Sequence, residues 1–130
     1  MNKLSDTKPT MHQLIAVTDD WRKDNHVDKH GVIIFQNKEQ LSNIRFTNDS
    51  FHSVAKNPRG AENLPETVKQ PTEIWSYWGD ASQKVVMRNY ILSGSNGNYV
   101  VTTKDGLIIS GIFVVNSSLD KYRKGLILIH

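Results

Sequence analysis

The sequence predicts an α+β fold, in which N-terminal helices pack on a mainly antiparallel sheet of four or five strands. The first half of the chain has stretches with a helical spacing of apolar residues, whereas the residues from Gln83 onward form three runs with the composition of strands. Asn96-Gly97 and Asp105-Gly106 separate these runs. Both dipeptides favour tight hairpin turns, because their residues tolerate positive φ.

The N-terminal part of the chain, residues 1–47, is predicted to contain one helix and one or two short strands. Four apolar side chains within residues 3–24 form an approximate helical stripe: Leu14, Ile15, Val17 and Trp21. After a break at Gly31, residues 32–35 have the composition of a short buried strand. A turn or short helix is expected at 37–42, and a second short strand is possible at 44–46.

Two further helices are expected before the sheet. Residues 48–50 are N-cap candidates for a helix that Asn57-Pro58 ends. A short helix is predicted over residues 64–70, with Pro65 in its first turn. The strand-like runs then follow at 83–92, 98–104 and 106–115, with a helical turn at 117–124 and a last apolar strand at 125–129.

Length and composition indicate a single domain that spans residues 1–130. The chain has no cysteine, which excludes disulfides, thiolate metal sites and a cysteine nucleophile. Its net charge of +3 has the sign expected of a protein that meets phosphates. No apolar run approaches the length needed to cross a bilayer, so no membrane-spanning segment is expected.

Five blocks of residues, taken in order, resemble the PBECR branch of the barnase/EndoU/colicin/RelE-like (BECR) ribonuclease superfamily. They are His52 with Lys56, LPETVKQPTEIW (64–75), VVMRNYI (85–91), NYVVTTKDGLIISGIFV (98–114) and LDKYRKGLILI (119–129). The resemblance implies a BECR-like nuclease core over residues 48–130. Residues 1–47 are then either a toxin entry or linker region, or the first helix and strands of the same domain.

The resemblance also implies an activity and a setting. Such domains are metal-independent ribonucleases without a cofactor, found in phage-derived proteins and at the C-terminus of contact-dependent growth inhibition toxins. As toxins they often cut tRNA in the cytoplasm of a target bacterium, and a cognate immunity protein neutralises them. The expected protein is therefore delivered within a larger secreted or cell-surface protein, or is cytoplasmic if it is phage-derived.

Metal-free RNA cleavage uses the substrate 2′-hydroxyl as nucleophile and leaves a 2′,3′-cyclic phosphate, so it requires proton transfer and stabilisation of negative charge. His52 is the predicted general acid or base, because imidazole titrates near neutral pH. Arg88, in the middle of a strand, is predicted to hold the phosphate oxygens. Lys56, one helical turn from His52, would add a second positive charge. Ser110 matches the family's Ser/Thr position and is expected to donate a hydrogen bond to the phosphate.

Three more residues are candidates for substrate binding. Tyr90 shares a strand face with Arg88 under the two-residue period of a strand, and Thr102 and Thr103 are alternatives to Ser110. The two-histidine-plus-lysine set of EndoU is not found at comparable spacing, which leaves the second proton-transfer group unassigned. No metal site is predicted, because His26 and His30 lack a nearby third ligand.

Two other functions stay open at the level of sequence. A non-catalytic RNA-binding or phage accessory module on the same fold would bind RNA in a salt-dependent way without forming products. An immunity or scaffold protein is the other alternative, which the basic charge and the hydroxyl-rich strands make less favourable.

Overall fold

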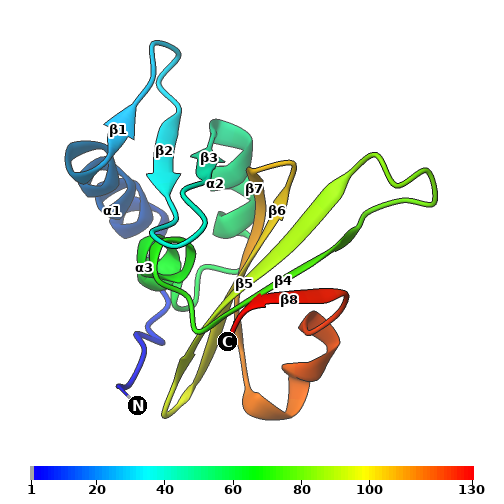
Figure 1. The fold of residues 1–130 in the computed structure, drawn as a ribbon. Helices are drawn as coiled ribbons and strands as arrows, with labels where there is room; N and C mark the ends of the chain where they lie inside the picture. Colours follow the sequence, from blue (N-terminus) through cyan, green and yellow to red (C-terminus); the bar gives the residue numbers. More distant parts are fainter. Residues whose placement is uncertain (1) are drawn as a thin grey trace.

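The computed structural model describes residues 2–130, which form three α-helices and one eight-stranded sheet (Figure 1). The helices are α1 (Met11–Asp24), α2 (Asn48–Ala55) and α3 (Leu64–Lys69). The strands are β1 (His26–Val27), β2 (Ile33–Gln36), β3 (Asn43–Phe46), β4 (Glu73–Trp78), β5 (Val86–Gly94), β6 (Gly97–Lys104), β7 (Leu107–Val114) and β8 (Leu126–Ile129). Their order in the sheet is β1-β2-β3-β7-β6-β5-β4-β8.

The α+β class is confirmed, but the prediction of four or five strands is wrong, because the sheet has eight. The additional strands are short and sit at both ends of the sheet. β1 has two residues, and its hairpin with β2 is closed by Asp28, whose carboxylate accepts hydrogen bonds from the backbone of His30 and Val32. β3 joins β7 through a single parallel pair, Arg45 with Leu107. Such pairings join distant parts of the chain, and local patterns do not reveal them.

The first helix begins at Met11, within the predicted range of residues 3–24. Thr10 is the N-cap, and it forms a capping box with Gln13, in which each side chain accepts a hydrogen bond from the other residue's backbone N–H. Leu14 and Trp21 then point into the core, where Trp21 packs edge-to-face on Phe35 and Phe46. One hydrophobic cluster therefore joins residues on both sides of position 47.

The antiparallel meander β5-β6-β7 follows the predicted turns. β5 and β6 meet at Gly94 and Gly97, while Asp105 (φ 48°) and Gly106 (φ 81°) connect β6 to β7. Directly paired residues of antiparallel strands point to the same face. Tyr90, Val101 and Gly111 therefore share one face, and Asn89, Thr102 and Ser110 share the other.

The three helices lie on the first of these faces, which is here called the helix side. α2 packs on β7, and α3 packs on β5 and β6. The opposite face of β4 to β7 is called the open side. The tail, residues 115–124, crosses part of the open side (orange in Figure 1) and packs Leu119 against Ile91 and Val100. The remainder of the open side carries the polar residues described below.

Candidate active site

Helix α2 presents His52 on its exposed surface. Thr47 and Ser50 form a capping box at the start of the helix, and the hydroxyl of Ser50 also donates to the backbone oxygen of Ile108 at 2.6 Å. Ser50 and Val54 thus face β7 and are buried. His52 lies between them in sequence and is exposed, as is Lys56, one turn further along.

A basic cavity lies at the C-terminal end of α2. It has a volume of about 320 Å³, and its lining includes Lys8, Lys56, Arg59, Ile112 and Phe113. The guanidinium of Arg59 stacks over the ring of Phe113 at 4.2 Å, with the carboxylate of Asp6 3.7 Å away. Three cations therefore surround this cavity, and Arg59 has a defined position in it.

The same cavity reaches the open side of the sheet. Ile112 is two residues from Ser110 on one strand, so both side chains point to the open side. β7 has β3 as a neighbour only near Leu107, so no strand among residues 2–130 covers the rest of that edge. The basic cavity therefore runs from Lys56, at the end of α2, to Ile112 on the open side, along the part of β7 that is called the β7 edge.

A polar row crosses the open side next to the β7 edge, formed by Asn89, Thr102 and Ser110 on three adjacent strands. Asn89 is only 1% exposed, and its amide oxygen accepts from Thr102 Oγ1 at 2.8 Å and from the hydroxyl of Tyr77 at 3.4 Å, while its amide nitrogen donates to the backbone oxygen of Tyr122 at 2.9 Å. This fixes the hydroxyl of Thr102. The half-buried hydroxyl of Ser110 makes no hydrogen bond with any described side chain or backbone group, so it is free to bind a ligand.

The tail is attached to the sheet beside this polar row by a salt bridge between Arg123 and Glu73, which is called the clamp. Arg123 donates two hydrogen bonds to the carboxylate of Glu73, at 2.8 and 2.9 Å, and a third to Asp120 at 2.8 Å. Burial raises the pKa of Glu73, but the hydrogen bonds from Arg123 and Trp75 outweigh it and hold the pKa below its ordinary value. Glu73 therefore stays ionised and fixes the tail on the sheet.

Three of the predicted site residues lie in strands and point to the helix side of the sheet. Tyr90 and Thr103 are each 1% exposed and belong to the interior. Arg88 is half-buried, pairs with Thr103 across the sheet, and has its Nη1 atom 3.5 Å from the hydroxyl of Tyr90. The sheet separates Arg88 from Ser110, so one phosphate cannot contact both side chains.

The structure thus divides the predicted residues into three groups. His52 and Lys56 share the exposed surface of α2, and Ser110 and Thr102 are cross-strand neighbours on the open side. Arg88, Tyr90 and Thr103 form the third group, on the strand faces of the helix side. Among residues 2–130, no three His, Cys, Asp or Glu side chains gather in a group that could hold a metal ion.

Sequence reasoning missed Asn89, Arg59 and Lys8. A signal for Asn89 exists, because it is an amide in an apolar strand and alternates with Arg88 and Tyr90. Arg59 follows directly on Asn57-Pro58, the predicted helix stop, but nothing local gives it a function. Lys8 has no sequence signal, because only the fold brings it to Lys56.

Comparison with known proteins gives one match, to a family model. Residues 11–130 match PBECR2, described as phage-Barnase-EndoU-ColicinE5/D-RelE like nuclease. The match includes α1 and the strands β1 to β3 as well as the later sheet. No curated protein and no solved structure matches the chain. Because the family model covers all but the first ten residues, the chain belongs to the PBECR2 family of BECR-type nucleases.

Proposed function

We propose that this nuclease is a metal-independent endoribonuclease that cuts RNA, with tRNA as its substrate, by attack of the 2′-hydroxyl on the adjacent phosphate. The products are a 2′,3′-cyclic phosphate and a free 5′-hydroxyl. The observation that carries the proposal is the three-cation cavity at the β7 edge, which begins at Lys56, one helical turn from the exposed His52, and reaches Ile112, two residues along β7 from the free hydroxyl of Ser110. Membership of a nuclease family supports a nucleic-acid substrate.

Each group at the β7 edge has a role suited to its chemistry. His52 exchanges a proton with the reacting oxygens, because imidazole is both an acid and a base near neutral pH. Lys56, Arg59 and Lys8 stabilise the negative charge that grows on the phosphate. Ser110 donates a hydrogen bond to a non-bridging oxygen, and Thr102 lies next to it. Asn89 acts as a positioning residue, through its hydrogen bond with Thr102.

The biological role that we propose is that of a toxin acting in the cytoplasm of a target bacterium. The net charge of +3 supports a partner of opposite sign, and an acidic immunity protein would both cover the cations at the β7 edge and bind quickly through electrostatic attraction. Delivery within a larger secreted or cell-surface protein fits this role, and a cytoplasmic, phage-derived protein is the other setting. No helix among residues 2–130 is long and apolar enough to cross a membrane.

The test is cleavage of purified tRNA in the presence of EDTA, with analysis of the new ends. Wild-type protein is expected to give fragments that end in a 2′,3′-cyclic phosphate, and His52→Ala is expected to give none while it keeps its folded circular dichroism spectrum. His12→Ala, an exposed histidine on α1, is the matched control and should cut like the wild type. Equal cleavage by the wild type and His52→Ala would refute the assignment of His52.

A second candidate function is RNA binding without cleavage. It is favoured by the absence of any histidine from the groups that line the basic cavity at the β7 edge. The same assay separates the two candidates, because a binding module would retain tRNA and release no fragments at any enzyme concentration.

A further inference from the structure

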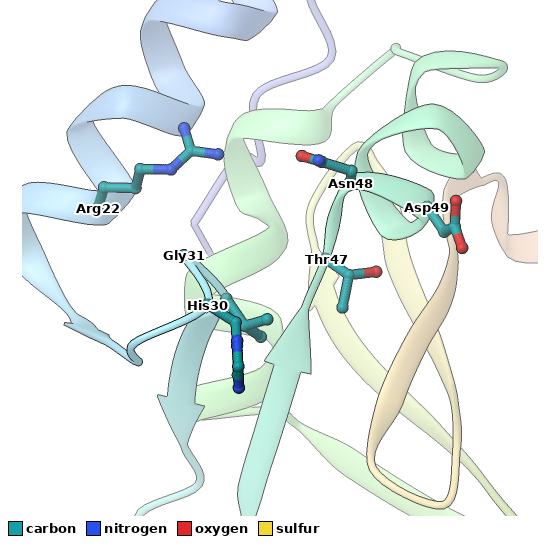
Figure 2. Close-up of a pocket in the computed structure, with 7 residues that line it drawn as sticks. Arg22, His30, Gly31, Thr47, Asn48 and Asp49 are labelled. Carbon is teal, nitrogen blue, oxygen red and sulfur yellow. The ribbon is translucent and has the colours of Figure 1, made fainter.

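A second polar cavity lies at the opposite end of α2 from the basic cavity. It has a volume of about 440 Å³, a size in the range of ligand pockets. Its walls come from α1, from the turn between β1 and β2, and from the start of α2: Arg22, His30, Gly31, Val32, Thr47, Asn48 and Asp49. Figure 2 shows Arg22 and Asn48 pointing toward one another from opposite walls.

These two side chains keep hydrogen-bonding capacity for a ligand. Arg22 uses Nη1 for the carboxylate of Asp19 at 3.0 Å, an exposed pair within one helix that competes weakly with other partners. The other guanidinium donors of Arg22 have no partner among the described residues. The amide of Asn48 has none either, because Thr47 and Ser50 perform the capping of α2. On one wall of the cavity, the guanidinium of Arg22 can donate hydrogen bonds to a ligand. On the other wall, the side-chain amide of Asn48 can both donate and accept them.

The position of the cavity connects it to the proposed site. Asn48 begins α2 and lines one cavity, while Lys56 follows the helix and lines the other, so these two residues lie roughly 12 Å apart along the helix, at 1.5 Å per residue. His52 lies midway between them on the exposed surface. An RNA strand whose phosphate sits beside His52 and Lys56 can therefore place a neighbouring base in this second cavity.

We propose that this cavity binds a purine base of the substrate and gives the nuclease a purine preference next to the cleaved bond; this inference rests on the proposed RNA cleavage. Guanine and adenine both carry the acceptor N7, which suits the guanidinium of Arg22, and pyrimidines lack it. The amide of Asn48 matches either the O6 acceptor of guanine or the N6 donor of adenine. The pair therefore selects purines over pyrimidines without choosing between the two purines.

Binding, which does not depend on cleavage, tests this inference. In the His52→Ala background, the affinity of fluorescent single-stranded RNAs is measured by anisotropy for a purine-only strand, a pyrimidine-only strand and a purine strand that contains 7-deazapurines. The purine strand is expected to bind about tenfold more tightly than either of the others. Arg22→Ala and Asn48→Ala should each reduce this ratio, whereas Lys23→Ala, an exposed cation on the same helix, should leave it unchanged.

The 7-deazapurine strand provides the decisive comparison. Loss of N7 should weaken binding to protein that retains Arg22, and it should have no further effect in Arg22→Ala, because the two atoms form one contact. Equal affinity for all three strands, or an N7 effect that persists in Arg22→Ala, overturns the inference. A failure of wild-type protein to cut any RNA would instead refute the proposed function, and the binding ratios would still decide whether the cavity selects purines.

Discussion

His52, Lys56 and Arg59 owe their proximity to a short helix and the loop that follows it. Val54 and Ser50 hold one side of α2 on β7, which leaves His52 on the exposed side. Arg59 stacks on Phe113 and so points to the end of that helix. Arg59 is therefore the arginine of the proposed site, whereas Arg88 points to the helix side of the sheet.

The two arginines can be compared directly. Arg59→Ala is expected to lower kcat/KM for tRNA cleavage about a hundredfold, because it removes one preorganised positive group from the phosphate. Arg88→Ala should change kcat/KM far less once the measured loss of folded protein is taken into account. Steady-state kinetics on both variants, with thermal unfolding as the stability control, measures the difference. A larger loss of kcat/KM in Arg88→Ala would move the site to the helix side.

At the scale of elements, α2 can approach β7 closely because Gly111 has no side chain. A Cβ atom at this position would lie 2.5 Å from the hydroxyl oxygen of Tyr99 and 3.2 Å from Val54 Cγ2. The hydroxyl of Tyr99 is buried and has no hydrogen-bond partner among the described residues. Burial of that hydroxyl raises the pKa of Tyr99, so the group stays neutral in the core.

The packing of α2 on β7 predicts a stability effect and its rescue. Gly111→Ala is expected to lower the free energy of unfolding by about 1–3 kcal/mol, through overpacking against Tyr99. Tyr99→Phe alone should be close to neutral, because the hydroxyl it removes has no partner. Chemical denaturation of both single variants and the double variant forms the cycle. If Tyr99→Phe recovers none of the loss caused by Gly111→Ala, the clash with the hydroxyl is not its cause.

The clamp between the tail and β4 predicts a pH-dependent stability. The pKa of Glu73 is lower in the folded protein than its ordinary value of 4.5, so its contribution is fully present above that value and is lost as the pH falls through the folded pKa. Glu73→Gln is expected to lower the unfolding free energy by up to about 1 kcal/mol near neutral pH, and by much less in acid. Urea unfolding across this range measures it, with the exposed Glu39→Gln as control. A difference that does not depend on pH would contradict the clamp.

At the scale of the whole molecule, the positive charge at the β7 edge predicts salt-dependent binding. The logarithm of the binding constant for single-stranded RNA falls linearly with the logarithm of the salt concentration, and each phosphate contact contributes roughly 0.7 to the magnitude of this slope. Replacement of Lys8, Lys56 and Arg59 by alanine should therefore reduce the slope by about two. Replacement of Lys3, Lys23 and Lys38, which are exposed and lie outside the basic cavity, gives the same net charge as a control. Equal slopes in the two triple variants would place the RNA elsewhere.

Local sequence patterns predict much of this fold, and long-range pairing explains what they miss. The meander follows from the two-residue period of its strands and from Asp105-Gly106, and the turn of helix that separates His52 from Lys56 follows from their spacing. The parallel contact of β3 with β7 and the approach of Lys8 to Lys56 join distant segments, and no local pattern reports them. Arg88 and Ser110 end on opposite faces partly because a β-bulge after Thr102 shifts the register of β7.

The proposed site places RNA along the β7 edge, away from Arg88 on the helix side of the sheet. The most direct measurement is the NMR shift of the side-chain Nε–H groups of Arg59 and Arg88 in His52→Ala protein titrated with single-stranded RNA, because these signals report on the two sides separately. Binding along the β7 edge should give a large shift for Arg59 and none for Arg88. A shift of Arg88 with Arg59 unchanged would contradict it.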